Sequence, residues 1–232
     1  MVDSGVTFVI MPLLSLIEDN LNFVIDLGIP ACSLSNATNT KSEEKKMGTY
    51  YYEIKNLKYK IVYLTPEKLV KSPPLIETVE TLYEMKKIDR FVIDEVHCVS
   101  HWGQDFRKDY LNLNILKKKF PTVPLLGLTA TATIKVKDDI VSRLGIKNDV
   151  VCFQSSFNRP NLLYEIRHKK DIKNIEHDLS LMLTTRFKKK SGIIYCISRK
   201  DCEKLSESLK RNYKIKCEYY HAELSYKKRQ EV

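Results

Sequence analysis

The sequence predicts an α/β fold with parallel sheets in two lobes. Short runs of apolar and β-branched residues recur, and each is followed by a polar or proline-containing turn and then by an amphipathic stretch. This alternation is typical of repeated βα units, in which helices cover a parallel sheet. The run FVID, up to its final Asp94, and the run GIIYC are apolar without interruption, as expected of strands that are buried on both faces.

The individual elements follow from this pattern in chain order. Each short apolar run is assigned as a strand, and each longer amphipathic stretch as a helix. The polar segment 35–59 is expected to be a surface excursion followed by a helix. The predicted strands are 7–11, 61–65, 91–94, 125–129, 193–197 and 217–221, and the predicted helices are 13–27, 75–86, 109–119, 134–144, 173–186 and 199–213.

A break in the helical pattern indicates the boundary between the lobes. Between Gly145 and Leu163 the chain carries polar turn residues and Pro160, which suit a connection between two compact bodies. We therefore predict a first lobe at 1–155, a linker at 156–163 and a second lobe at 164–232.

Composition and charge indicate a globular protein inside a cell. The 232 residues are 43% hydrophobic and carry a formal charge of +10. This charge favours polyanionic partners, although a lysine-rich solvated surface explains it equally well. The six cysteines contain no C-x-x-C pair, so we expect reduced thiols and no zinc site. Asp3 and Pro12 interrupt the apolar start, so we expect neither a signal peptide nor a membrane span.

Two adjacent carboxylates, Asp94 and Glu95, follow the apolar run that ends at Ile93. In parallel sheets, ligands bind outside the carboxyl ends of the strands. A carboxylate there can hold Mg²⁺ through water, and its neighbour can orient or deprotonate an attacking water. We assign the metal to Asp94 and the water to Glu95. Taken alone, an Asp-Glu pair at a strand end is more often a solvated helix cap.

The residues after the carboxylates favour a functional interpretation. His97, Trp102, Phe106 and Arg107 bring an imidazole, two aromatic faces and a guanidinium into one short segment. Such a loop can stack the bases and contact the phosphates of a single nucleic-acid strand. Taken alone, Trp102 can also be explained as a core anchor.

These residues also carry a family resemblance. Asp94-Glu95-Val96-His97 resembles the DEAH-type Walker B box of superfamily 2 helicases, and residues 98–110 resemble the aromatic-rich loop of the RecQ family. Other segments resemble further motifs in the family's order. These are VIMPLLSLIEDN at 9–20 (motif Ia), YLTPEKL at 63–69 (motif Ib), LTATAT at 128–133 (motif III), SFNRPNL at 156–162 (interlobe signature) and GIIYCISRKDCEKLSESL at 192–209 (motif IV).

The resemblance implies two RecA-like lobes and an ATP- and Mg²⁺-dependent motor that moves 3′ to 5′ on DNA, in recombination and repair. Its partners would be single-stranded DNA and duplex junctions, and its location the nucleus in a eukaryote. It implies catalytic roles for Asp94, Glu95 and His97, and coupling roles for Thr129 and Thr131. Without it, the hydroxyls of LTATAT are simply helix caps. The implied DNA contacts are Pro12, Ser15, Thr65, Pro66, Trp102, Phe106 and Arg107.

A phosphate loop of the form G-x-x-x-x-G-K-[ST] does not occur in the sequence. The resemblance places this loop and its strand just before residue 7, and motifs V and VI beyond residue 232. We therefore expect a first lobe without its phosphate-loop strand, with an apolar gap and unpaired edges in the sheet, and a partial second lobe. We also expect weak ATP binding and no ATPase activity from the chain alone.

The leading hypothesis is thus a fragment of a RecQ-type ATP-dependent DNA helicase. One alternative is a non-catalytic DNA-binding remnant, which would keep salt-dependent binding of single-stranded DNA. A second alternative is a truncated, non-functional product that does not fold, which a cooperative melt would exclude.

Overall fold

The structure is a computed structural model of the chain and describes all residues except 1–4, 35–40, 103–106, 147–149, 157 and 169–173. The chain folds into two compact units, Met1–Gln154 (unit 1) and Ser155–Val232 (unit 2). Within the described residues, no helix is both long and apolar enough to cross a membrane.

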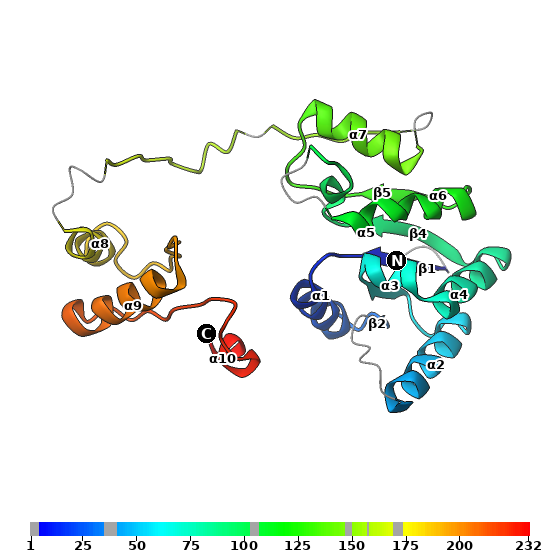
Figure 1. The fold of residues 1–232 in the computed structure, drawn as a ribbon, viewed down its shortest axis with the longest axis horizontal. Coiled ribbons are helices and arrows are strands. Elements are labelled where there is room, and N and C mark those ends of the chain that lie inside the picture. The colour runs from blue at the N-terminus through cyan, green and yellow to red at the C-terminus, as the bar shows by residue number, and fades with distance from the viewer. Residues whose placement is uncertain (1–4, 35–40, 103–106, 147–149, 157, 169–173) are drawn as a thin grey trace. The chain divides into compact units, whose positions relative to one another are not determined.

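Unit 1 contains a five-stranded sheet in which every pairing is parallel, so the predicted α/β class is confirmed (Figure 1). The strand order is β2-β3-β1-β4-β5. The predicted strands 7–11, 61–65, 91–94 and 125–129 all fall on members of this sheet, whereas β2 was not predicted. The strands are β1 (Val6–Ile10), β2 (Ala31–Ser33), β3 (Ile61–Leu64), β4 (Ile88–Ile93) and β5 (Leu125–Gly127).

Helices connect the strands of unit 1. The predicted helix 134–144 is confirmed with the same bounds, whereas the predicted helix 109–119 is interrupted by the 3-10 helix Asn112–Asn114. Helix α3 was not predicted. The α-helices of this unit are α1 (Leu14–Asp26), α2 (Lys41–Lys55), α3 (Pro66–Lys71), α4 (Pro73–Glu84), α5 (Lys108–Leu111), α6 (Ile115–Lys119) and α7 (Ile134–Leu144).

The core lies on both faces of the sheet. Along β1, Val6, Phe8 and Ile10 are fully buried and belong to the larger hydrophobic cluster. Met11 belongs to a second cluster, with Ile17 of α1. Because side chains alternate along a strand, these two clusters cover opposite faces. Burial of each large apolar side chain stabilises the fold by roughly 1.5–3 kcal/mol.

The sheet is continuous from β2 to β5, so the expected gap in its middle is not present among the described strands. The reason is that β1 and β4 pair directly, through Thr7–Arg90, Phe8–Phe91 and the following residues. Among the described residues, strand β5 pairs only with β4 and forms one edge of the sheet. Leu126 of β5 is 46% exposed, so the apolar exposure lies at this edge.

Unit 2 consists of helices α8 (Ile175–Thr184), α9 (Arg199–Tyr213) and α10 (Tyr226–Glu231). Helix α9 has the predicted bounds, and α10 was not predicted. The strands predicted at 193–197 and 217–221 are wrong, because the described part of unit 2 contains no strand. Parallel strands need neighbours on either side and cover on both faces, and Tyr195 is 91% exposed.

Candidate functional site

The carboxyl ends of four neighbouring strands carry the predicted site residues. Pro12 follows β1, Thr65 follows β3, Asp94 follows β4 and Thr129 follows β5. Because the strands are parallel, these ends lie along one edge of the sheet, in the order β3, β1, β4, β5. With neighbouring strands 4.7–4.9 Å apart, this edge is roughly 14 Å long.

The turn after β4 presents the two carboxylates. Asp94 N donates a hydrogen bond to Ile10 O at 2.9 Å, so pairing with β1 continues through Asp94. Asp94 Oδ1 accepts a hydrogen bond from Glu95 N at 2.9 Å. Glu95 has φ +50° and ψ 43°, a left-handed conformation that costs a residue with a side chain about 1–2 kcal/mol. This turn directs the Glu95 carboxylate toward His97, where Oε2 lies 3.1 Å from Nδ1.

The imidazole of His97 links the ends of β4 and β5. Its side chain is 11% exposed, and Nδ1 lies 2.9 Å from Thr129 Oγ1. The other ring nitrogen, Nε2, lies 3.9 Å from Cys98 Sγ. A carboxylate, an imidazole and a hydroxyl thus form one connected group, which we call the Glu95–His97–Thr129 cluster.

Thr131 supports this cluster through its backbone. Its N–H donates to Thr129 Oγ1 at 3.1 Å, and its carbonyl oxygen accepts from the same hydroxyl at 3.2 Å. Gly127 permits a close approach beside it, because an added Cβ would lie 3.2 Å from both methyl carbons of Val96. Val96 N also donates to Leu128 O at 2.8 Å. The turn after β5 therefore packs directly on the 3-10 helix Val96–Val99.

Arg107 and Tyr110 connect the far end of the loop to the strand ends. Arg107 Nη1 donates to Pro12 O at 2.9 Å, which brings two of the predicted DNA-binding residues together. Tyr110 is fully buried, and its hydroxyl donates to Asp94 O at 3.0 Å. Burial raises the pKa of Tyr110, so its hydroxyl keeps its proton at neutral pH. The sequence reasoning did not identify this role of Tyr110.

Side chains on α7 contact the near end of the loop. Asp139 Oδ2 accepts a hydrogen bond from Ser100 Oγ at 2.7 Å, and Asp139 Oδ1 accepts one from Arg143 Nε at 2.8 Å. Lys135 Nζ lies 3.2 Å from the centroid of the Trp102 ring. The sequence reasoning missed Ser100 and these three helix residues. Their spacing of four residues, which puts them on one helix face, was the available signal.

The pKa of Asp139 lies below its ordinary value. Burial raises this pKa, but the hydrogen bonds from Ser100 and Arg143, together with the charge of Arg143, outweigh burial. Asp139 is therefore a carboxylate at neutral pH.

The remaining residues predicted to bind DNA differ in how exposed they are. Ser15 is exposed in the first turn of α1. Thr65 is half-buried and caps α3, since its Oγ1 accepts from Lys68 N at 3.4 Å. Pro66 is buried in the first turn of α3. Phe106 lies outside the described residues.

The donor set at the strand end suits a hard cation that keeps most of its water. The described residues contain no group of three or more His, Cys, Asp or Glu side chains that could hold a metal ion. Mg²⁺ commonly binds through one or two carboxylates, water and phosphate oxygens, whereas structural zinc takes four protein ligands. Asp94, half-buried at the strand end, fits the first kind of ion.

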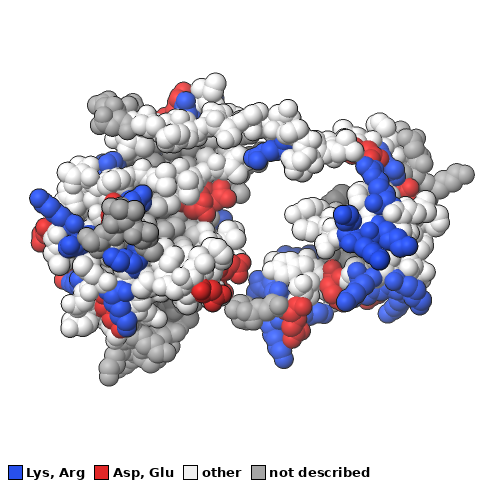
Figure 2. Space-filling model, turned by 180° about the vertical axis from the view of Figure 1, so that it is seen from behind, with Lys and Arg blue, Asp and Glu red and all other residues white. Residues whose placement is uncertain are grey.

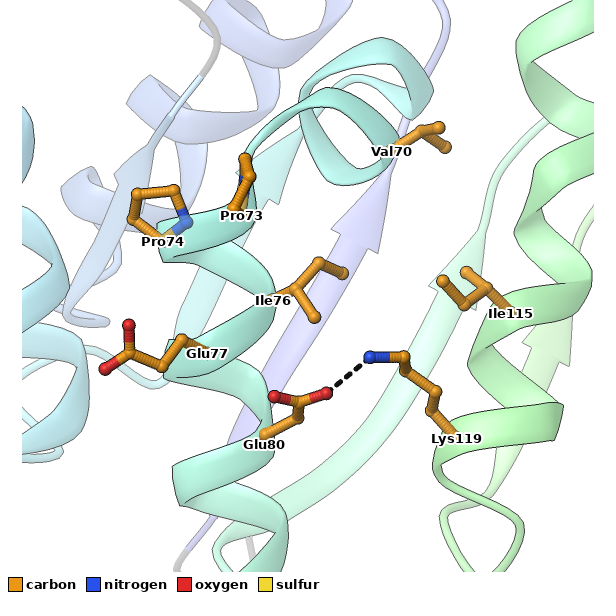
Figure 3. Close-up of a pocket in the computed structure, with 8 residues that line it drawn as sticks. All are labelled: Val70, Pro73, Pro74, Ile76, Glu77, Glu80, Ile115 and Lys119. Carbon is orange, nitrogen blue, oxygen red and sulfur yellow. Dashed lines mark hydrogen bonds and ion pairs between the residues drawn. The ribbon is translucent and has the colours of Figure 1, made fainter.

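A shallow hollow of about 510 Å³ lies between α4 and α6, and none of the predicted site residues lines it (Figure 3). Glu80 and Lys119 form an ion pair across one side of it, with Oε1 and Nζ 2.5 Å apart. None of its lining residues belongs to the Glu95–His97–Thr129 cluster. The lining residues are Val70, Pro73, Pro74, Ile76, Glu77, Glu80, Ile115 and Lys119.

Comparison with known protein families gives a match to the DEAD/DEAH box helicase family over residues 2–140. This range includes the five strands of the sheet, both carboxylates and the turn that carries Thr129. Among solved structures, the helicase domain of Pyrococcus furiosus Hef covers 62% of this chain and 28% of its own, at 18% identity and a TM-score of 0.39.

Similar curated proteins are named as DNA helicases. ATP-dependent DNA helicase hus2/rqh1 of Schizosaccharomyces pombe is 42% identical over 98% of this chain. ATP-dependent DNA helicase Q1 of Pongo abelii is 45% identical over 95%, and RecQ-like DNA helicase BLM of Xenopus laevis is 42% identical over 97%. The chain spans 17%, 33% and 16% of the length of these three relatives, in that order.

Proposed function

The chain belongs to the DEAD/DEAH box helicases and within them to the RecQ type, and from this premise we propose that it carries half of a nucleotide site and a DNA-contacting loop of a 3′-to-5′ DNA helicase. The observation that carries this proposal is the Glu95–His97–Thr129 cluster at the carboxyl edge of the sheet. Unwinding in recombination and repair belongs to the same proposal.

In the proposed reaction the two carboxylates have separate tasks. Asp94 would hold Mg²⁺ through water, and such an ion, when bound, neutralises charge on phosphate oxygens. Glu95 orients the water that attacks the terminal phosphate and accepts its proton. The hydrogen bond from Glu95 N to Asp94 Oδ1 holds the Asp94 carboxylate in place. Hydrolysis also needs groups that bind the phosphates from the side opposite these two carboxylates.

His97 is proposed to relay the state of the nucleotide site. Its Nδ1 is within hydrogen-bonding distance of both Glu95 and Thr129, so a shift of the Glu95 carboxylate alters the interaction with the turn after β5. Thr131 fixes the Thr129 hydroxyl from the other side. The cluster therefore suits a coupling role between hydrolysis and strand movement.

DNA is the proposed partner of the loop after the carboxylates. Trp102 is 62% exposed, which leaves a large aromatic face for base stacking, worth about 1–3 kcal/mol per base. Pro12, Ser15, Thr65 and Arg107 lie at or near the same edge of the sheet and would contact the backbone. Pro66 and Phe106 are proposed to belong to the same DNA-binding surface. Pro66 is buried in the first turn of α3, so its part in this surface is to shape the turn after β3.

The distribution of charge supports a polyanionic partner. Unit 2 carries 19 Lys and Arg against 10 Asp and Glu, a net charge of +9, whereas unit 1 carries 20 against 19, a net charge of +1. Figure 2 shows blue side chains gathered on the unit that contains α8 to α10, and a mixture of blue and red on the other. Basic residues in such excess attract the phosphates of DNA.

The 232 residues contain no G-x-x-x-x-G-K-[ST] loop, and we propose that the chain by itself binds ATP weakly and does not hydrolyse it. As a protein acting on DNA it would function inside the cell, in the nucleus if the organism is eukaryotic. Duplex junctions are the proposed substrates.

The catalytic proposal is tested in a chimera that joins the phosphate loop and the later motifs of a helicase Q1 to this chain. DNA-stimulated ATPase activity is expected in the chimera. Glu95→Gln, which keeps the shape and removes the base, should lower turnover by about 10²–10⁴-fold. Glu84→Gln, a change at an exposed position at the end of α4, serves as the charge-matched control. Equal turnover of the Glu95 variant and the control would contradict the role of Glu95.

A non-catalytic DNA-binding module is the second candidate, and the charge of unit 2 is the observation that favours it. The unmodified chain would then bind single-stranded DNA with an affinity that falls steeply with salt. This candidate predicts the same binding with no ATPase activity even in the chimera, which separates it from the motor.

A further inference from the structure

The near end of the DNA-contacting loop is held by one buried hydroxyl. Ser100 is fully buried, and its Oγ donates to Asp139 Oδ2 at 2.7 Å, across 39 residues of sequence. The same Oγ accepts from Trp102 N at 3.2 Å. This hydroxyl thus donates to helix α7 and accepts from the loop backbone, so it joins the two.

Helix α7 holds the loop at a second point one turn earlier. Lys135 Nζ lies 3.2 Å from the Trp102 ring centroid, in the geometry of a cation–π interaction. Arg143 Nε donates to Asp139 Oδ1 at 2.8 Å and so orients the carboxylate that receives Ser100. The adjacent face of α7, one residue on in the helical repeat, is anchored in the core by Val136, Ile140 and Leu144.

The same helix is connected to the Glu95–His97–Thr129 cluster. It begins directly after the turn that carries Thr129, with Thr133 as its N-cap. The 3-10 helix Val96–Val99 connects His97 back to Ser100. Loop, 3-10 helix, turn and α7 are therefore joined in a closed ring. Ser100 and Trp102 contact α7 itself, and His97 contacts the turn that leads into it.

We propose that Asp139 is a positioning residue, which fixes Trp102 through Ser100 at a set place relative to the Glu95–His97–Thr129 cluster. This inference rests on the proposed function, because it assumes that Trp102 stacks on DNA bases. Asp139 itself touches no DNA. Its effect is to restrict the Trp102 ring before DNA binds, so that the ring loses less conformational entropy when a base stacks on it.

Fluorescence of Trp102 tests the positioning role without DNA, since Trp102 is the only tryptophan in the chain. Ser100→Ala and Asp139→Ala should each lower its fluorescence anisotropy and raise its quenching by acrylamide about twofold, as the ring gains motion. Asp138→Ala changes the same charge at an exposed neighbour on the same helix and should leave both signals unchanged. Unchanged signals in both test variants would overturn the proposal.

Binding of a labelled oligothymidine by the 232-residue chain supplies the second measurement. Ser100→Ala and Asp139→Ala should each weaken affinity about fivefold, and the double variant about fivefold as well, because both changes remove one shared hydrogen bond. Losses that multiply to about 25-fold, or a loss matched by Asp138→Ala, would overturn the proposal. Circular dichroism confirms that each variant is folded at the assay temperature.

Trp102→Ala separates this inference from the function on which it rests. If Trp102→Ala binds DNA as tightly as the unmodified chain, the proposed DNA role of the loop fails. The fluorescence measurement then decides alone whether Asp139 positions the ring.

Discussion

His97 Nδ1 lies 2.9 Å from the hydroxyl oxygen of Thr129, although 32 residues separate them in the chain. The Thr129 hydroxyl donates to Thr131 O, so its oxygen is left to accept hydrogen bonds. Nδ1 of His97 is then the donor toward this oxygen, and the Glu95 carboxylate, with Oε2 at 3.1 Å, is a second acceptor for it. Nε2 faces the Cys98 thiol. The turn after β5 and the Glu95 carboxylate thus hold the same ring nitrogen.

Thr129→Val should therefore destabilise unit 1. The change keeps the shape of the side chain but removes the hydrogen bonds of its hydroxyl to His97 Nδ1 and to the backbone of Thr131, at an expected cost of about 1–2 kcal/mol. Thr131→Val is the matched control, since Thr131 bonds to Thr129 through backbone atoms, and it should cost less than about 0.5 kcal/mol. Urea unfolding followed by Trp102 fluorescence measures both. Equal free energies of unfolding for the two variants would show that the hydrogen bond contributes nothing.

The left-handed backbone of Glu95 predicts an unusual order of variant stabilities. Glu95→Ala removes the carboxylate and keeps the strained φ of +50°, whereas Glu95→Gly removes both the carboxylate and the strain. We expect the glycine variant to be more stable than the alanine variant by about 1 kcal/mol, the reverse of the order in a regular helix or strand. Thermal unfolding of the two variants gives the comparison. An alanine variant that is the more stable would mean that the turn relaxes in solution.

The low pKa of Asp139 predicts how the stability of unit 1 depends on pH. Because the pKa is lower in the folded state than its ordinary value of 3.8, Asp139 binds fewer protons when folded. Its contribution is fully present above that value and is lost as the pH falls through the folded pKa. The stability difference between the unmodified chain and Asp139→Asn should therefore be constant near neutral pH and shrink only below about pH 4. Asp138→Asn is the matched control for loss of a carboxylate from the same helix. A difference for Asp139→Asn that does not shrink at all as the pH falls below about 4 would rule out this origin.

Much of unit 1 could be predicted from the sequence because its signals are local. Strands β1, β3, β4 and β5 are apolar runs bounded by polar residues, and the carboxylates Asp94 and Glu95 follow one of them directly. Parallel pairing then brings these strand ends together without further information. Helix α7 was predicted with its observed bounds because a capping threonine precedes it and Gly145, at φ +72°, ends it.

Other features depend on distant partners and could not be predicted. The bond from Ser100 to Asp139 spans 39 residues, and nothing near Ser100 in the sequence indicates it. Strand β2 has only three residues and forms because β3 offers it a free edge. In unit 2 a strand was predicted where none is found. The apolar run around Tyr195 has the pattern of a strand, but the described residues offer it no neighbouring strand.

The two runs of three lysines allow a direct test of where DNA binds. Lys188, Lys189 and Lys190 are exposed in unit 2, which holds nearly all the excess positive charge. In the other run, Lys117 Nζ donates to Pro121 O and Val123 O, and Lys119 is paired with Glu80, so these side chains serve the fold. Both runs carry the same charge, and their surroundings differ.

Replacing residues 188–190 with alanine should therefore weaken DNA binding and reduce the slope of log affinity against log salt by about one for each phosphate that is no longer neutralised. The same replacement at 117–119 should leave the slope unchanged and lower the stability of unit 1. Titration of labelled single-stranded DNA at several salt concentrations measures both slopes. Equal slopes for the two triple variants would mean that the basic surface of unit 2 takes no part in binding, since the run at 117–119 removes the same three charges.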